Sequence, residues 1–117
     1  METFIEDQGL FWQYPVITEK TFYDQNKDDV DYVGIPWATV LDKRYDVKQI
    51  AEKLTPLLPG KVYYTCCQHI SFRKLIPLFR HLNIKTVFSP HKKIGECFIH
   101  GVEINESNHR KDPERSL

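Results

Sequence analysis

The stretch that decides the fold runs from Lys61 to Cys67 and reads Lys-Val-Tyr-Tyr-Thr-Cys-Cys. It is rich in β-branched and aromatic residues and shows no alternation of apolar and polar positions. Strands of parallel sheets, which are buried on both faces, have this composition. Cys66 and Cys67 then point to opposite faces of the strand. Because three cysteines with one adjacent pair make a poor disulfide framework, we interpret Cys66, Cys67 and Cys97 as reduced core thiols.

Other short apolar runs predict strands on either side of this one. Residues 32–35 form a buried run that Pro36 stops, and residues 84–89 form a second that Pro90 stops. Residues 97–104 indicate a further strand or a hairpin, because Gly101 interrupts the run.

Helical spacing appears between these runs. Residues 18–25 predict a short helix, and Asp46 caps a second helix that Pro56 ends or kinks. A third helix follows Ser71, with its apolar residues at helical spacing. Pro77 lies inside it, so we expect a kink or two abutting turns there.

Strands and helices that alternate in this way predict right-handed crossovers and a parallel sheet. The sequence therefore predicts an α/β fold: a small Rossmann-like three-layer domain with a short, mainly parallel sheet. We assign residues 18–104 to this domain. Residues 1–17 form an aromatic N-terminal arm, and the almost wholly polar residues 105–117 form a linker or tail.

The composition of the 117 residues is that of a globular protein, with 41% hydrophobic, 13% aromatic and 27% charged residues. No apolar run is long enough for a membrane span, and the N-terminus has no signal-peptide pattern, so we expect a cytoplasmic protein. Residues 1–58 hold 11 acidic and 6 basic residues, whereas residues 59–117 hold 5 and 10. This split indicates either solvated surface or an anionic partner for the second half, while overall neutrality argues against nucleic-acid binding.

Polar and aromatic residues follow each of the three predicted strands. Because ligands of open α/β sheets bind at the carboxyl ends of the strands, we expect these loops to line one crevice that suits a sugar or a phosphate. The candidate binding residues are Trp37, Gln68, Ser71, Ser89 and Lys92, and the candidate catalytic residues are His69 and His91.

His69 is the first candidate because an imidazole can take a proton from a hydroxyl near neutral pH. The alternative is that its ring only stabilises the loop before Ser71. His91 has the same two interpretations. The ring of Trp37 either stacks on a sugar or belongs to the core.

Motifs of other chemistries are absent from the sequence. It contains no glycine-rich dinucleotide motif, no P-loop, no nucleophile elbow and no cysteine or histidine pair at convincing zinc spacing. We therefore expect neither a cofactor nor a metal.

Three stretches together resemble a known family. Residues 32–43 read Tyr-Val-Gly-Ile-Pro-Trp-Ala-Thr-Val-Leu-Asp-Lys, residues 64–77 read Tyr-Thr-Cys-Cys-Gln-His-Ile-Ser-Phe-Arg-Lys-Leu-Ile-Pro, and residues 86–92 read Thr-Val-Phe-Ser-Pro-His-Lys. They are similar to the N-terminal region of exostosin-like glycosyltransferases of bacteria and large viruses. The resemblance covers about residues 14–115.

The resemblance implies half of a GT-B architecture, in which this half holds the acceptor and a C-terminal domain holds the nucleotide-sugar. Such enzymes are metal-independent and invert the anomeric carbon. His69 would then be the base, with His91 second, while Gln68, Ser89, Lys92 and Trp37 would hold the acceptor. The chain ends at Leu117 without a donor domain, so we expect residues 1–117 alone to be inactive.

Two other functions stay open. The first is a non-catalytic Rossmann-like module that binds a sugar or a phosphorylated ligand. The second is a protein-interaction domain whose aromatic arm, with Phe4, Phe11, Trp12 and Tyr14, docks a partner. A homodimer that covers the face of the missing domain is also compatible with the sequence.

Overall fold

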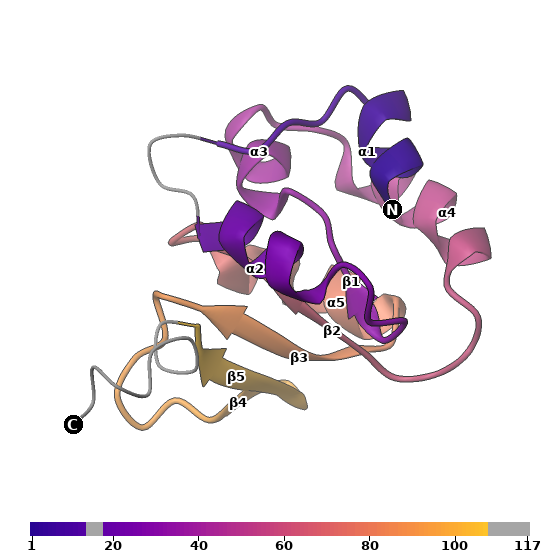
Figure 1. Ribbon diagram of the computed structural model, residues 1–117. Helices are drawn as coiled ribbons and strands as arrows, with labels where there is room; N and C mark the ends of the chain where they lie inside the picture. The colour runs from indigo at the N-terminus through magenta and orange to yellow at the C-terminus, as the bar shows by residue number, and fades with distance from the viewer. Residues whose placement is uncertain (14–17, 108–117) are drawn as a thin grey trace.

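The computed structural model describes residues 1–13 and 18–107. Figure 1 shows a twisted sheet with helices packed on it. The elements, in chain order, are α1 (Glu2–Asp7), α2 (Thr18–Asn26), β1 (Tyr32–Val33), α3 (Trp37–Asp42), α4 (Val47–Leu54), the 3-10 helix η1 (Thr55–Leu57), β2 (Tyr63–Cys66), the 3-10 helix η2 (Phe72–Leu75), α5 (Ile76–His81), β3 (Ile84–Ser89), β4 (Phe98–Ile99) and β5 (Val102–Glu106).

The sheet has five strands in the order β1-β2-β3-β5-β4. The first four strands of this order run parallel, and only β4 at the edge is antiparallel to its neighbour β5. The predicted α/β class with a mainly parallel sheet is therefore confirmed. From β1 to β3, each new strand is added on the same side of the previous one. In other open α/β sheets, the ligand crevice opens where the strand order changes direction, and there is no such point between β1 and β3.

Strand register sorts the side chains onto two faces. One row across the sheet is Val33, Thr65, Val87 and Ile104, all buried. The indole Nε1 of Trp37 donates to Thr65 Oγ1 at 2.8 Å on this face, and Phe79 of α5 packs edge-on against the Trp37 ring. The opposite face carries the neighbouring row of Tyr32, Tyr64, Thr86 and Glu103.

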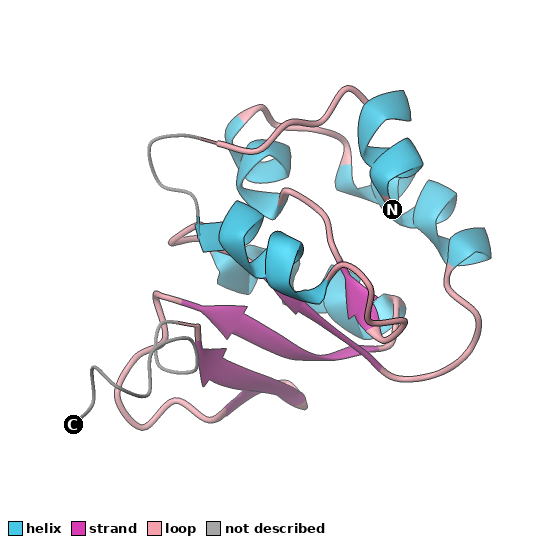
Figure 2. Cartoon of the chain, in the orientation of Figure 1, coloured by secondary structure: helices cyan, strands magenta, loops and turns pink. Residues whose placement is uncertain are grey.

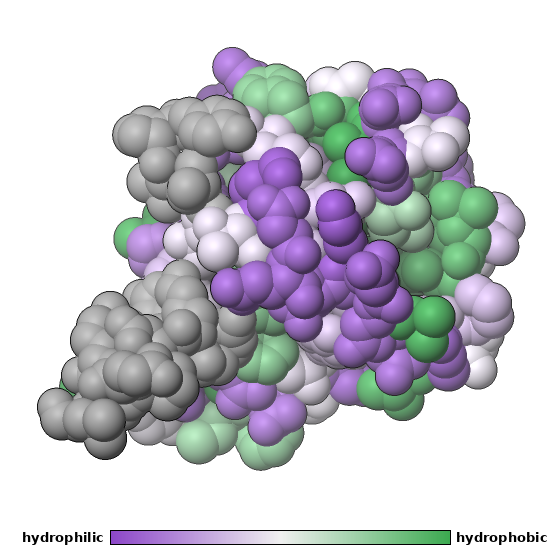
Figure 3. All heavy atoms as spheres, viewed as in Figure 1, coloured by the Kyte–Doolittle hydropathy of each residue, from purple (hydrophilic) through white to green (hydrophobic). Residues whose placement is uncertain are grey.

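Helix α2 covers part of this second face (Figure 2). The ring of its Phe22 lies 5.5 Å from that of Tyr32, 6.3 Å from that of Tyr64 and 5.1 Å from that of Phe88, measured between centroids. The outer side of α2 is hydrophilic (Figure 3). Helices on the two faces of the sheet make the three layers that the sequence predicts.

The cap and the prolines that predict where helices begin, end or divide have these effects in the structure. Asp46 caps α4 by accepting from the amides of Lys48 and Gln49, and α4 gives way to η1 at Thr55, one residue before Pro56. The third helix is two abutting pieces, η2 and α5, with Pro77 in the first turn of α5, where a missing N–H costs little. The hairpin of β4 and β5 turns through His100 and Gly101, both at positive φ.

The structure also differs from the expected boundaries. Helices α1 and α3 were not predicted, and β5 continues two residues beyond position 104. In the N-terminal arm, Phe4 is buried in the core and Trp12 is half-buried against Tyr23, whereas Phe11 is 46% exposed. Residues 14–17 of the arm and residues 108–117 of the tail lie outside the described residues.

The cysteines are free thiols, as predicted, and Cys66 and Cys67 are buried in the core. Cys97 is exposed, so its assignment to the core is wrong: it precedes the edge strand β4, which no further strand covers in the described part of the chain. Within residues 1–13 and 18–107, no helix has the length and apolar character needed to cross a membrane.

Candidate functional site

The loops that follow β1, β2 and β3 meet at the carboxyl edge of the sheet, as predicted. They enclose a cavity of about 490 Å³ together with the end of the N-terminal segment and the start of α2. The cavity is lined by Gln13, Thr18, Ala38, Gln68, His69, Ile70, Pro90 and His91. Both candidate histidines therefore reach the same cavity.

Hydrogen bonds occupy both ring nitrogens of His69. Its Nδ1 accepts from the amide of Ser71 at 2.9 Å, and its Nε2 lies 2.7 Å from Oδ1 of Asp42. An Nδ1 that accepts a hydrogen bond carries no proton, so the proton is on Nε2, which donates to Asp42. The ring therefore has no free lone pair to accept a proton from a ligand. This geometry fits the loop-stabilising interpretation of His69 better than the role of a base.

Asp42, at the end of α3, completes this arrangement. Its side chain is 44% exposed. Partial burial raises the pKa of Asp42, but hydrogen bonds from Gln13 and His69 outweigh it and hold this pKa below the usual value. Asp42 therefore stays ionised and fixes the tautomer of His69.

His91 is different, because its imidazole has no hydrogen-bond partner among the residues that the structure describes. Its main chain is held on both sides: the amide donates to Ser89 Oγ at 3.1 Å, and the carbonyl accepts from Arg73 Nη2 at 3.0 Å. The residue is half-buried and lines the cavity. Of the two candidate histidines, His91 is therefore the one whose ring nitrogens have no partner among the described residues.

Arg73 ties the His91 loop to η2. Its Nε and Nη2 donate to the two carboxylate oxygens of Glu96 at 2.9 and 2.7 Å. These bonds from Arg73, with a further bond from the amide of Lys93, lower the pKa of Glu96 to about 2 although partial burial opposes them. A bidentate pair of this kind fixes orientation as well as distance, so it holds the loop that carries His91.

Three of the predicted binding residues serve the fold instead. Trp37 has no exposed surface, so its ring is part of the core and is not available to stack on a sugar. Ser89 is fully buried, and its hydroxyl accepts from His91. Gln68 lines the cavity but is only 7% exposed, and its Oε1 accepts from the amide of Glu19 at 2.9 Å.

The other two predicted binding residues lie near the cavity without lining it. Ser71 is half-buried, and its amide rather than its hydroxyl makes the bond to His69. Lys92 is half-buried beside His91 and is not among the lining residues.

Sequence reasoning missed Glu19, which lies beneath the cavity and is 2% exposed. Its Oε2 accepts from the amides of Gln68 at 2.9 Å and Ala38 at 3.1 Å. Burial raises the pKa of Glu19 to about 8, against the lowering effect of these amides and of Cys67. A signal was present in the sequence: Glu19 precedes Phe22 and Tyr23 at helical spacing, on the same buried stripe of α2.

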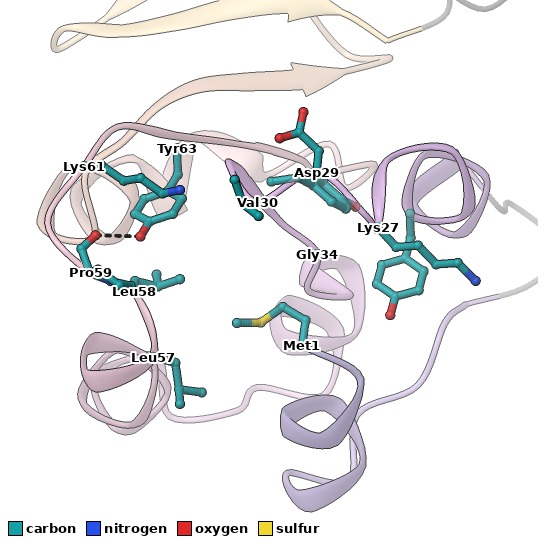
Figure 4. Close-up of a pocket in the computed structure, with 12 residues that line it drawn as sticks. Met1, Lys27, Asp29, Val30, Gly34, Leu57, Leu58, Pro59, Lys61 and Tyr63 are labelled. Carbon is teal, nitrogen blue, oxygen red and sulfur yellow. Dashed lines mark hydrogen bonds between the residues drawn. The ribbon is translucent and has the colours of Figure 1, made fainter.

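A second cavity of about 350 Å³ lies beside the starts of β1 and β2. Figure 4 shows Met1, Leu57 and Leu58 on one side of it and Gly34 and Val30 on the other. Lys27 and Lys61 both line it; Lys61 is paired with Asp31 at 3.0 Å, and Tyr63 donates to the carbonyl of Pro59. The lining of this cavity thus combines apolar side chains with tyrosine, lysine and aspartate side chains.

In the described ranges, no three His, Cys, Asp or Glu residues are grouped so that they could hold a metal ion. Comparison with known proteins adds no assignment, since no family model, no curated protein and no solved structure matches the chain.

Proposed function

We propose that the chain is the acceptor-side domain of a glycosyltransferase, which holds a hydroxyl-bearing sugar or glycan at the carboxyl edge of its sheet. The observation that carries the proposal is the imidazole of His91, which lines a 490 Å³ cavity and has no hydrogen-bond partner in the described part of the chain. The sequence resemblance to exostosin-like enzymes gives the proposal its reaction class.

The proposed chemistry follows from the position of His91. The acceptor hydroxyl attacks the anomeric carbon of the donor, and the bond from that carbon to the diphosphate oxygen breaks. His91 takes the hydroxyl proton, and the nucleotide diphosphate leaves with the bonding electron pair. Gln13 and Thr18 supply an amide and a hydroxyl at the same cavity for orienting the acceptor.

The nucleotide-sugar would bind on a second domain, as it does in GT-B enzymes. We therefore propose that residues 1–117 bind the acceptor but transfer no sugar alone. A cytoplasmic location fits this proposal, because the three cysteines are free thiols, which suits a reducing compartment.

The test is an NMR titration of the 15N-labelled chain with a panel of free sugars and with UDP- and GDP-sugars. We expect saturable shifts of the amides of residues 68–71, 89 and 91–93 with a free sugar, and none with nucleotides. His91→Gln should weaken the binding at least fivefold, whereas His81→Gln, on the exposed end of α5, should leave it unchanged. Mass spectrometry of the same mixtures should detect no transferred sugar.

Shifts caused by nucleotides, absence of any response at the two loops, or sugar transfer by the isolated chain would each contradict the proposal.

A second function has one observation in its favour. Because both ring nitrogens of His69 are occupied, the edge could bind a ligand without performing chemistry. Sugar binding that His91→Gln leaves unchanged would favour this non-catalytic module.

A further inference from the structure

The second face of the sheet contains a cavity that the proposed function does not use. Helix α2 lies across the β1 side of this face, and none of the helices in residues 1–13 and 18–107 lies over β5 there (Figure 2). Beside α2 on this face is a cavity of about 390 Å³, lined by residues of β2, β3 and β5. This volume is within the range of small-ligand pockets.

Strand register explains which side chains reach this cavity. Tyr64, Thr86 and Glu103 form one row across β2, β3 and β5, because they are register partners on the same face. Phe88 and Asn105 are partners in the next row of that face. All five residues line the cavity, and Phe22 of α2 closes it on one side.

Three aromatic rings form a corner of this cavity. The ring of Tyr64 is inclined at 72° to that of Phe22 and at 77° to that of Phe88, with centroids 6.3 and 6.1 Å apart. Rings that meet nearly at right angles present π faces in two directions. The faces of aromatic rings carry partial negative charge and attract cations.

The polar groups of the cavity also favour a cation over an anion. Among the residues that the structure describes, Glu103 is the only charged one that lines it, and no described Lys or Arg does so. Thr86 Oγ1 donates to Glu103 Oε1 at 3.1 Å and so orients the carboxylate. Nearby, Asp29 Oδ2 accepts from the hydroxyl of Tyr64 at 2.7 Å, which adds a second acidic group behind the aromatic wall. An anion or a phosphate would meet repulsion here, whereas a cation would not.

We propose that this cavity binds a small organic cation of the alkylammonium type. The methyl or methylene groups of such an ion pack against Phe22, Tyr64 and Phe88, and its charge faces the Glu103 carboxylate. The side-chain amide of Asn105 is available for a polar substituent of the ligand. The site is separate from the carboxyl-edge cavity, since the two share no lining residue.

The test is a titration of the 15N-labelled full chain with choline chloride at constant ionic strength. The matched control ligand is 3,3-dimethyl-1-butanol, which has the same shape without the charge. We expect choline to shift the amides of Phe88, Glu103 and Asn105 saturably, and the neutral alcohol to bind at least fivefold more weakly. Glu103→Gln should weaken choline binding roughly tenfold and remove most of the preference for the cation.

Glu103→Gln keeps an oxygen that accepts from Thr86, so the variant is expected to fold, and its NMR spectrum will show whether it does. Phe88→Leu provides a second variant that removes a ring face without changing charge. Glu52→Gln, on the exposed side of α4, is the charge-matched control and should bind choline like the wild type. Equal affinity for choline and the neutral alcohol, a shift of the same residues by glucose but not by choline, or no saturable response would each overturn the proposal.

Discussion

Raising the pH from 5 to 8 is expected to destabilise the fold through one buried carboxyl group, that of Glu19. This side chain is 2% exposed and accepts from the amides of Ala38 and Gln68. Burial raises its pKa to about 8 from an ordinary value of 4.5, although these amides and Cys67 oppose the shift. In the unfolded chain the same carboxyl is in water and ionises near its ordinary value.

The sign follows from which state keeps the proton. Between pH 4.5 and about 8 the folded state retains the Glu19 proton and the unfolded state has lost it. The free energy of unfolding therefore falls as pH rises, with a slope of up to about 1.4 kcal/mol per pH unit. Over the whole range from pH 4.5 to about 8, the free energy of unfolding falls by at most roughly 5 kcal/mol, which is comparable to the total stability of a small domain. Below pH 4.5 the stabilisation is fully present.

The assay is urea unfolding of the wild type and of Glu19→Gln at pH 5, 6, 7 and 8. Glutamine keeps an oxygen for the two amides but does not ionise, so subtracting the two stabilities cancels the other titrating groups. We expect the advantage of the wild type over Glu19→Gln to shrink steadily from pH 5 to pH 8. Glu52→Gln serves as an exposed control with no such trend. A difference that stays flat within about 0.5 kcal/mol, or that grows with pH, would refute the reasoning.

Three further predictions concern side chains and backbone that hold the fold together. Glu96→Gln removes the bidentate bonds from Arg73 and should lower the free energy of unfolding by roughly 1 kcal/mol at pH 7. The pKa of Glu96 is lowered to about 2, so this difference from the wild type should vanish as pH falls from 4.5 to 2 in acid-unfolding curves. Trp37→Phe removes the hydrogen bond to Thr65 and leaves a cavity, so urea unfolding should show a loss of roughly 2–4 kcal/mol, with sugar affinity unchanged in the NMR titration. Gly34→Ala would place a methyl group 2.5 Å from Cδ1 of Tyr23, and thermal unfolding should show a lower Tm, equivalent to about 1–3 kcal/mol.

Most of the fold could be predicted because the decisive signals are local. The run from Lys61 to Cys67 marked a strand buried on both faces, and Pro77 marked the junction of η2 and α5. Helix α3 was missed for a physical reason. Pro36 reads as the end of a strand, yet here it is the N-cap of α3, whose first four residues are all buried and show no helical periodicity.

The carboxyl-edge site was only partly predictable. Sequence placed the loops correctly, since parallel strands bring their carboxyl ends to one edge. Which imidazole is free depends on partners far away in the chain: Asp42 is 27 residues from His69, and Glu19 is 49 residues from Gln68. No local pattern reports such pairs, so the sequence could not show that both ring nitrogens of His69 are occupied.

The direction of the strand order explains why this edge depends on the N-terminal segment. The strand order does not change direction from β1 to β3, so the loops after these strands do not diverge to form a crevice. One wall of the cavity comes from Gln13 and Thr18 instead. The neighbouring Glu19 connects this wall to the loops, because its carboxyl accepts from Ala38 and Gln68, which also line the cavity. The protonation of Glu19 and the shape of the cavity therefore depend on the same contacts with Ala38 and Gln68.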